Sequence, residues 1–577
     1  MTWKNDEEKR EALRATGHNP AYWFDRPPRI AEITAEIDLI LSATHGRTRT
    51  ELRKRISNHC AVRELAIEAG KIGKPLASLL DKSRNIFDME TFRTDDEHIL
   101  TDMAEIHRYI TDFFTEWFAG EKIDTEGMHA DTVDWQRLLT DRQYYNNFQS
   151  ENKVEPHLQD ILWRAIQKTQ EPLNAKISPD SDTTVKDHIE ATLTAPPTLA
   201  EFKSACKNTK GGDAPGPSGL TWQMVSNWSD PVVEHVYNLL ISIHADGSSP
   251  QHWAWKWLAP IPKVTSNVTV KDLRPLSLIE VLRKLWNGIQ VRKVWPLLAK
   301  HNLLHNAQNA YLRNRGCKDA SIQLINALEE AEQAATLIAL SSWDFTRAFD
   351  SVSHIASKLS LYRFGIPHTM CSALVNNNAR TLTFIKSPAA TKHWNKHIKS
   401  HGSAESYTHT NPFDSPAAPF IAKRGVGQGD VDSTLIWNCF MDILLCALDT
   451  EEQDIFKVKG PHDIIHSDST SIAYADDMQS IAASREALQK KADIVSAFSI
   501  TFRIKINLTK LRTLLVQHGL ETAVEKNPTI IVHTEGWEPN TISLKKDNNF
   551  KALGIKHSQD NDCKQHFNDL RNILKRT

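Results

Sequence analysis

The sequence lacks the features that mark secreted, zinc-finger and membrane proteins. Only seven of its 577 residues are cysteines, and they fit neither a disulfide framework nor a zinc knuckle, because their number is odd and no pair is spaced as Cys-x-x-Cys. No apolar run approaches the length of a membrane span, and the charged stretch 1–14 does not resemble a signal peptide. These absences predict a soluble, intracellular protein that is not secreted and has no membrane partner.

An excess of charge of either sign is also lacking. The chain carries 69 basic and 71 acidic residues, so no overall positive field indicates a nucleic-acid partner. Any such site must be a local groove. The length is sufficient for several domains.

Residues 1–195 have the pattern of a mostly helical region. Apolar residues at three- and four-residue spacing predict a packing helix over 99–118, and a second helix at 47–63 carries a basic surface that is either solvated or in contact with RNA. The polar, proline-bearing stretch 171–197 predicts a domain boundary.

The strongest local pattern is a pair of adjacent acids between two apolar segments. Residues 472–481 read Ile-Ala-Tyr-Ala-Asp-Asp-Met-Gln-Ser-Ile, which predicts two short strands joined by a tight turn. Adjacent carboxylates raise each other's pKa, so Asp476 and Asp477 at a hairpin tip indicate a bound cation, and hard oxygen ligands suit Mg²⁺. An isolated Asp-Asp pair is more often a polar turn, so this interpretation depends on three further segments.

The first of these segments supplies a third acid. An apolar strand at 336–340 leads to Asp344 at a strand-to-helix turn. There its carboxylate could join Asp476 and Asp477 as a metal ligand. Asp350, further along, is expected to cap the helix that follows.

The other two segments carry cations and glycines. Lys263 ends one predicted strand and Arg274 lies in the next, so one hairpin could grip a triphosphate through an ammonium and a guanidinium. A surface hairpin with incidental cations is the alternative. The glycine-rich turn at 423–430 opens a helix with a buried stripe. Within this turn, Gln428 and Gly429 are expected to lie close to a nucleotide.

The order of these segments, followed by 505–510 and 550–554, resembles the reverse transcriptases. The likeness is greatest to those of non-long-terminal-repeat (LINE-type) retrotransposons, and it covers about residues 200–556. It implies an α/β (α+β) fold: a right-hand polymerase with fingers and palm, a central antiparallel sheet and a mostly helical N-terminal region. The domains expected are a helical region at 1–195, fingers at 196–335, a palm at 336–556 with a polar insertion at about 381–423, and the start of a truncated thumb at 557–577.

The resemblance implies RNA-directed DNA synthesis, in which a dNTP is joined to the 3′-hydroxyl of a DNA primer on an RNA template. Two Mg²⁺ ions are implied, with Mn²⁺ as the alternative metal. Asp344, Asp476 and Asp477 would be the catalytic acids and, with the main-chain carbonyl of Phe345, the metal ligands. Lys510 is similar in place to the family lysine that protonates the leaving pyrophosphate.

The resemblance also assigns the substrate contacts. The nucleotide-binding residues would be Lys263, Arg274, Phe345, Phe349, Gln428 and Gly429, and the primer grip would be Leu553 and Gly554. Phe349 matches a bulky ring that clashes with a ribose 2′-hydroxyl, which favours deoxynucleotides. An ordinary core phenylalanine is the alternative.

Two other functions stay open. The short segment after Gly554, with no recognisable endonuclease or Cys/His finger, indicates a partial copy of such an element, and this could be a catalytically inactive remnant that binds RNA. An RNA-dependent RNA polymerase is disfavoured by Phe349.

Several features depart from the family pattern. Ser218 replaces the common aspartate in the first glycine-rich loop, and Leu511 replaces the usual threonine after Lys510. Gly427 stands where the family usually has proline, and Asp430 is expected to bring a negative charge near template or nucleotide. The insertion contains histidines at four-residue spacing that a helix could turn into metal ligands (His393, His397 and His401). Because the stretch has no apolar stripe, a surface loop is favoured.

Overall fold

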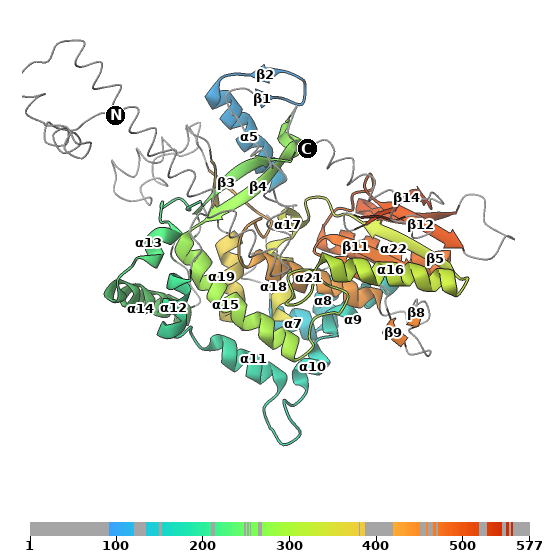
Figure 1. Cartoon of the computed structure of the whole chain (residues 1–577), viewed down its shortest axis with the longest axis horizontal. Coiled ribbons are helices and arrows are strands. Elements are labelled where there is room, and N and C mark those ends of the chain that lie inside the picture. The colour runs from blue at the N-terminus through green and yellow to red at the C-terminus, as the bar shows by residue number, and fades with distance from the viewer. Residues whose placement is uncertain are drawn as a thin grey trace, which may run out of the picture. The chain divides into compact units, whose positions relative to one another are not determined.

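Two four-stranded sheets and the helices packed around them make up the part of the chain that the computed structural model describes (Figure 1). The described residues are 92–119, 134–148, 153–208, 214–246, 250, 253, 255–263, 268–379, 381–386, 419–449, 457–459, 465–468, 471–517, 528–544, 550–552 and 555–557. They belong to one compact unit. The mixed α/β composition agrees with the predicted fold class at this level.

The N-terminal part of the described chain begins with a small hairpin and a helix. Strands β1 (Phe92–Arg93) and β2 (Ile99–Leu100) pair in antiparallel fashion, and helix α5 (Met103–Trp117) follows. The prediction of a helix from residue 99 was therefore wrong at its start, because Asp102 accepts hydrogen bonds from the amides of Ala104 and Glu105 and caps the helix there. The predicted basic helix at 47–63 lies outside the described residues.

A group of helices follows α5 in the chain. These are α7 (Trp135–Thr140), α8 (Arg142–Phe148), α9 (Pro156–Gln167), α10 (Gln170–Asn174) and α11 (Val185–Thr194). Buried side chains from this group, such as Leu162 and Ile189, share one hydrophobic cluster with residues as distant in sequence as Val532. The division at residue 195 therefore stays a prediction, and the core continues across it.

The first four-stranded sheet has the strand order β4-β3-β6-β7. Its strands are β3 (Trp255–Pro262), β4 (Leu273–Ile279), β6 (Leu382–Ile385) and β7 (Phe420–Ile421). The predicted hairpin of β3 and β4 is confirmed, with Ile261 opposite Arg274. Helix α5 lies beside this sheet, and its Ile110 and Phe114 are buried in one cluster with Leu258 (Figure 1).

Helices next to this sheet form a separate hydrophobic cluster. They are α12 (Leu199–Lys207), α13 (Trp222–Ser226), α14 (Asp230–Asp246) and α15 (Val281–Lys300). Phe202 of α12 and Trp286 of α15 meet edge to face in this cluster, with ring centroids 6.1 Å apart.

The second sheet is antiparallel throughout, with the order β10-β11-β5-β12. Its strands are β5 (Leu337–Trp343), β10 (Ser471–Tyr474), β11 (Asp477–Ala482) and β12 (Arg512–Gln517). The predicted strand before Asp344 and the predicted hairpin at 472–481 are both confirmed. Helices α16 (Cys317–Gln333) and α22 (Arg485–Phe502) both contact this sheet.

The remaining described elements connect or flank these layers. They are α17 (Ala348–Ser351), α18 (His354–Tyr362), α19 (His368–Ala379), α21 (Ser433–Leu448), β8 (Lys457–Lys459), β9 (Ile465–Asp468), β13 (Thr529–Thr534), β14 (Glu538–Ser543), β15 (Phe550–Ala552) and β16 (Ile555–His557), with short 3₁₀ turns at Val270–Asp272 and Glu535–Trp537.

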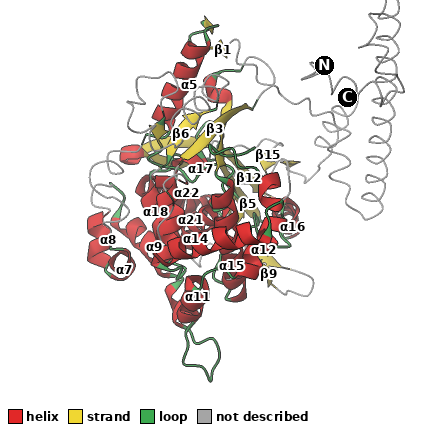
Figure 2. Ribbon diagram, turned by 90° about the vertical axis from the view of Figure 1, so that its left-hand side faces the viewer, coloured by secondary structure: helices red, strands yellow, loops and turns green. Residues whose placement is uncertain are grey.

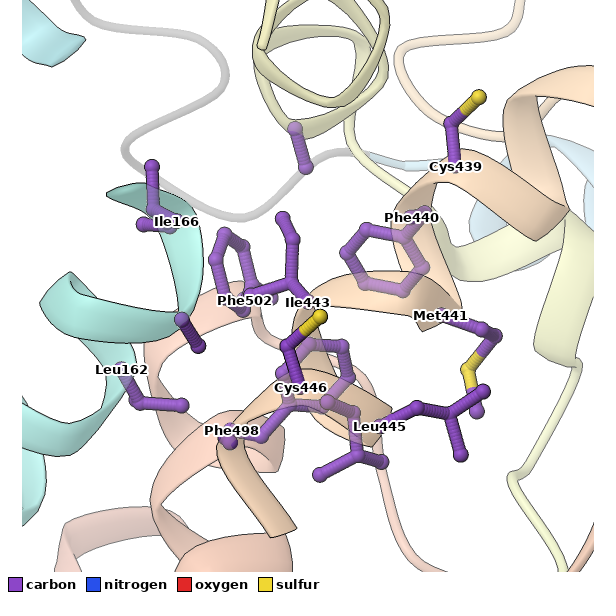
Figure 3. Close-up of a cluster of buried hydrophobic side chains, with 14 of the residues drawn as sticks. Leu162, Ile166, Cys439, Phe440, Met441, Ile443, Leu445, Cys446, Phe498 and Phe502 are labelled. Atoms are coloured by element: carbon purple, nitrogen blue, oxygen red, sulfur yellow. The ribbon is translucent and has the colours of Figure 1, made fainter. Parts of the chain in front are cut away.

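Helix α21 is the centre of the largest core. All of its residues except Thr434 are buried, and Figure 2 shows it among α9, α18 and α22. In Figure 3 its Phe440 faces Phe498 and Phe502 of α22, with ring centroids 5.0 and 5.5 Å apart. The predicted buried stripe is thus confirmed, and burial extends around the whole helix. Among the described residues no helix is both long and apolar enough to cross a bilayer.

Candidate active site

The two adjacent acids lie at the tip of the β10–β11 hairpin. Tyr474 pairs with Asp477, so Ala475 and Asp476 form the turn between the strands. Ala475 has a φ of +58°, a left-handed conformation that costs a residue with a Cβ about 1–2 kcal/mol. Contacts outside the turn must therefore stabilise it.

The side chain of Gln308 provides these contacts. Its Oε1 accepts hydrogen bonds from the amides of Ala475 and Ala310, both at 3.0 Å, and its Nε2 donates to the carbonyl of Ala475 at 3.4 Å. Gln308 is only 3% exposed. Main-chain bonds reinforce the contact, since the amide of Asn309 donates to the carbonyl of Ala473 at 2.8 Å. The buried amide thus fixes both polar main-chain groups of the residue before Asp476.

Asp344 follows strand β5, which is the neighbour of β11 in the sheet. Its main-chain carbonyl accepts a hydrogen bond from the amide of Asn507 at 2.8 Å. The ammonium of Lys510 lies 3.4 Å from Oδ1 and 3.3 Å from Oδ2 of the Asp344 carboxylate. Segments that are far apart in the sequence therefore bring Asp344 and Lys510 together, and the predicted roles of these residues stay predictions.

Asp476 and Asp344 are close enough to repel each other. Burial and then the negative charge of Asp344 raise the pKa of Asp476, and the positive charge of Lys510 partly offsets this. Two carboxylates that repel each other in a partly buried site fit a divalent cation, which prefers hard oxygen ligands and would remove the repulsion. Asp477, the third predicted acid, is exposed.

The complete predicted ligand set is not assembled in the described part of the chain. Among the described residues no three His, Cys, Asp or Glu side chains are grouped to hold a metal ion. The main chain of Phe345 pairs with Ile506, while its ring is buried. The ligand roles of Phe345 and Asp477 therefore stay predictions.

Two other cations act electrostatically on Lys263. Loss of solvent, followed by the positive charges of Arg274 and Lys510, lowers the pKa of Lys263. Lys263 follows β3 and Arg274 lies in β4, whereas Lys510 precedes β12 of the other sheet. The charge of Lys510, which lies beside Asp344, therefore acts on the hairpin of the first sheet. Such a cluster of like charges fits a polyanionic ligand.

The glycine-rich turn packs on β4 of the first sheet. The amide of Ser277 in β4 donates to the carbonyl of Gln428 at 2.8 Å, and a Cβ on Gly429 would lie 3.0 Å from a methyl group of Leu276. Gly429 has a φ of +100°. This turn therefore needs glycine at 429 both for its backbone and for its close packing on β4.

The side chain of Gln428 binds Asp350 within the protein. Its Nε2 donates to Oδ2 of Asp350 at 3.1 Å, and the indole nitrogen of Trp117 donates to the same oxygen at 3.3 Å. The expectation that Asp350 caps a helix was wrong. Asp350 is inside the short helix α17, and Ser353 caps the following helix α18. Burial raises the pKa of Asp350 to about 7.

Phe349 is half-buried and is supported from behind by a second ring. Its ring stacks on Trp437 of α21, with centroids 4.8 Å apart and planes inclined by 21°. This contact would hold the ring in a defined position. The predicted role of Phe349 in excluding a 2′-hydroxyl stays a prediction.

Asp430 does not point towards a nucleotide site as expected. Its side chain is fully buried, and Oδ2 lies 3.6 Å from Nη2 of Arg283. Buried Lys256 is a second nearby cation. A Cβ on Gly427 would lie 2.8 Å from the Asp430 carboxylate. The two departures from the family pattern are thus spatially linked, because the carboxylate occupies the space that a side chain at 427 would need.

Several predicted residues lie outside the described part of the chain. These are the primer-grip residues Leu553 and Gly554, the histidines His393, His397 and His401, and residues 209–213 of the first glycine-rich loop. Strands β15 and β16 flank the primer-grip pair and are hydrogen-bonded to each other, with Ala552 opposite Ile555.

Sequence reasoning missed the roles of Gln308, Asp350 and Trp117. Their contacts join segments that are far apart in the chain, so no local spacing could indicate them. The sequence held one indirect signal. Two-residue hairpin turns favour glycine or asparagine, so an alanine in such a turn indicates that hydrogen bonds from another segment hold it. Tyr311 was also missed. Burial and then the negative charge of Asp476 raise the pKa of its phenol.

Comparison with known proteins places these features in a family. The sequence profile described as "Reverse transcriptase (RNA-dependent DNA polymerase)" matches residues 261–557, slightly more than half of the chain. The "Retrovirus-related Pol polyprotein from type-1 retrotransposable element R2" of Nasonia vitripennis is 25% identical over 339 residues, which are 58% of this chain and 27% of the relative. The corresponding R2DM polyprotein of Drosophila melanogaster is 24% identical over 347 residues, which are 59% of this chain and 28% of the relative.

A third relative comes from a vertebrate. The "Transposon TX1 uncharacterized 149 kDa protein" of Xenopus laevis is 22% identical over 376 residues, which are 65% of this chain and 25% of the relative. This chain matches about a quarter of the length of each of these three proteins. The profile match and the retrotransposon relatives together show that the chain belongs to the reverse transcriptase family, in its non-long-terminal-repeat (LINE-type) branch.

Proposed function

We propose that this chain is an RNA-directed DNA polymerase of a non-long-terminal-repeat retrotransposon, which extends a DNA primer on an RNA template with dNTPs. The observation that carries the proposal is the meeting of Asp344, Asp476 and Lys510 at the ends of neighbouring strands, with the Lys510 ammonium 3.3 Å from Asp344. Membership of the reverse transcriptase family supports the same reaction.

The two sheets correspond to the fingers and palm of a right-hand polymerase in this proposal. The β4-β3-β6-β7 sheet would belong to the fingers and would carry Lys263 and Arg274. The β10-β11-β5-β12 sheet would be the palm, which carries the acids. The glycine-rich turn contacts β4 and leads into α21, so it would form the link between the two.

Two Mg²⁺ ions would be held by Asp344, Asp476 and Asp477 with the carbonyl of Phe345. When bound, they would lower the pKa of the primer 3′-hydroxyl and neutralise charge on the phosphates. The repulsion between Asp344 and Asp476 supports this assignment. Family membership implies dependence on a divalent cation, and Mg²⁺ in particular is part of the proposal.

The cations and the ring would bind and select the nucleotide. Lys263 and Arg274 would grip the triphosphate through charge-assisted hydrogen bonds. Lys510, whose ammonium lies 3.3 Å from Asp344, would donate a proton to the leaving pyrophosphate. Phe349, supported by Trp437, would exclude nucleotides with a 2′-hydroxyl. Precise positioning of the reacting groups would account for most of the rate.

Extension of a DNA primer on an RNA template with Mg²⁺ and dNTPs tests the proposal. The wild type is compared with Asp476→Asn, which keeps the shape of the side chain and removes its charge. Asp180→Asn is the matched control, because Asp180 is exposed in the loop between α10 and α11. We expect extension by the wild type and the control, and its loss in Asp476→Asn. Equal extension by both variants would contradict the assigned site, and RNA binding without extension by the wild type would favour an inactive remnant.

A further inference from the structure

A groove of about 640 Å³ lies between α12, α13 and α15, beside the glycine-rich turn. Residues that line it include Asn208, Trp222, Lys284, Gly288, Arg292 and Val431. Val431 directly follows the glycine-rich turn, so the groove reaches the edge of the candidate active site. None of the roles assigned above uses it.

Helix α15 gives the groove a cationic floor. Lys284, Gly288 and Arg292 follow one another at four-residue intervals, so they lie along one face of the helix. The helical rise places Lys284 and Arg292 about 12 Å apart along the axis. Gly288 between them is buried, and a Cβ there would lie 3.4 Å from Nη1 of Arg292. The guanidinium of Arg292 therefore lies close over Gly288. This contact explains why glycine, which normally weakens a helix interior, is found at this position.

The positive charge of Lys284 and Arg292 is not neutralised by ion pairs. The acid in the groove, Glu201, accepts hydrogen bonds from Thr198 and lies 3.4 Å from the ammonium of Lys293. Within the described part of the chain, no carboxylate lies within ion-pairing distance of Lys284 or Arg292. The groove thus presents net positive charge along about 12 Å of helix.

An aromatic side chain completes the groove. Trp222 at the start of α13 is half-buried and lines the groove opposite α15. A positively charged groove that also offers an aromatic ring fits a single-stranded nucleic acid, whose phosphates and bases require these two kinds of contact.

We infer that this groove binds the single-stranded RNA template ahead of the position being copied. The phosphates of the template contact Lys284 and Arg292, and a base stacks on Trp222. The inference rests on the proposed function, because it identifies the nucleic-acid strand in the groove beside Val431 as the RNA template of the polymerase. In this inference the template RNA reaches the candidate active site along the groove, past Val431 at the end of the glycine-rich turn.

Binding of two labelled primer–template duplexes to the full chain tests the inference. One duplex is blunt at the template 5′ end, and the other has an RNA overhang of about ten nucleotides, long enough to fill such a groove. We expect the wild type to bind the overhang duplex more tightly. Lys284→Gln and Arg292→Gln should each reduce this gain and should each lower the salt dependence of log K by about 0.7 per lost phosphate contact. Lys300→Gln, on the same helix but exposed outside the groove, should behave like the wild type.

Changes at Trp222 test the stacking contact. Trp222→Leu should weaken binding of the overhang duplex roughly 5- to 150-fold, the range that corresponds to one lost base stack. Trp222→Phe, which keeps an aromatic ring, should retain most of the affinity of the wild type. It thereby distinguishes the loss of a base stack from a folding defect. An equal overhang gain in the wild type and all groove variants, or no overhang gain in the wild type, would overturn the inference.

The binding measurement does not depend on catalysis. If the wild type binds the overhang through the groove but does not extend the primer, the proposed function fails and the groove remains a nucleic-acid site. If the wild type extends the primer while the groove variants bind and extend as it does, the proposed function stands and the groove has another role.

Discussion

Replacement of Gln308 by methionine should damage the active site without removing any predicted catalytic group. The change keeps the approximate volume but leaves the buried amides of Ala475 and Ala310 without their shared acceptor. Each unsatisfied amide costs about 1–3 kcal/mol of folding free energy, so the native conformation of the turn is destabilised by about 2–6 kcal/mol. The left-handed conformation of Ala475 is then no longer fixed, and Asp476 moves with it.

The expected result is a large loss of rate. A displacement of about 1 Å in a catalytic group can cost on the order of a hundredfold, so we expect a loss of this size in primer extension at saturating dNTP. The apparent melting temperature should fall as well, because buried hydrogen bonds are lost. Single-turnover extension and a thermal melt, performed on the same preparation, measure both effects.

Gln479→Met is the matched control for this experiment. Gln479 is also fully buried, lies in β11 next to the acids, and its amide makes no hydrogen bond within the described part of the chain. Removal of this amide should leave the rate and stability nearly unchanged. If Gln308→Met extends the primer as fast as Gln479→Met does, Gln308 does not position Asp476 and the reasoning is refuted.

Three further changes test the surroundings of the site. Asp350→Asn removes a carboxyl whose pKa is raised to about 7, so the ionised form destabilises the folded wild type as the pH rises through 7. The melting temperature of this variant should therefore increase relative to the wild type between pH 5 and pH 8, and a constant difference would contradict the assignment. Phe349→Ala should increase the incorporation of ribonucleotides relative to deoxynucleotides, and the absence of any gain would reject the proposed steric selection. Arg274→Gln should raise the KM for dNTP by about 10- to 100-fold with a smaller effect on kcat. Lys271→Gln in the same hairpin is its control, because Lys271 is paired with Asp95 at 2.7 Å, and equal KM values for the two variants would argue against a triphosphate contact at Arg274.

The elements that carry the acids could be predicted because each has a local signal. Short apolar runs locate β5 and the β10–β11 hairpin, and these runs place Asp344 and Asp476 at strand ends. The contacts of Asp350 could not be predicted in this way. Aspartate is a favoured residue at a helix N-cap, and only the tertiary fold brings Trp117 and Gln428 to the Oδ2 atom of Asp350.

Buried charges explain why the unusual glycine-rich turn is compatible with the fold. Burial raises the pKa of Asp430 and of Asp432, and the nearby positive charge of Arg283 opposes this change in both. Arg283 in turn donates to the carbonyl of Trp253 at 3.0 Å and to Oδ1 of Asn378 at 2.7 Å. The turn is thus attached to α15 by an ion pair in the protein interior. Removal of one partner of such a pair strongly destabilises a fold, because the other charge stays buried without compensation.

The ion pair between Arg283 and Asp430 lies on one side of α15, and the groove lies on another. Arg283 faces inward to Asp430 of the glycine-rich turn, and the next residue, Lys284, lines the groove. A template phosphate bound by Lys284 would therefore act on the same helical turn that holds Asp430. Because the main chain of Gln428 is also bonded to β4, a shift of α15 would be transmitted to the glycine-rich turn and to the hairpin that carries Lys263 and Arg274. We expect occupancy of the groove to affect the KM for dNTP as well as RNA affinity, so Lys284→Gln should change this KM more than Lys300→Gln does.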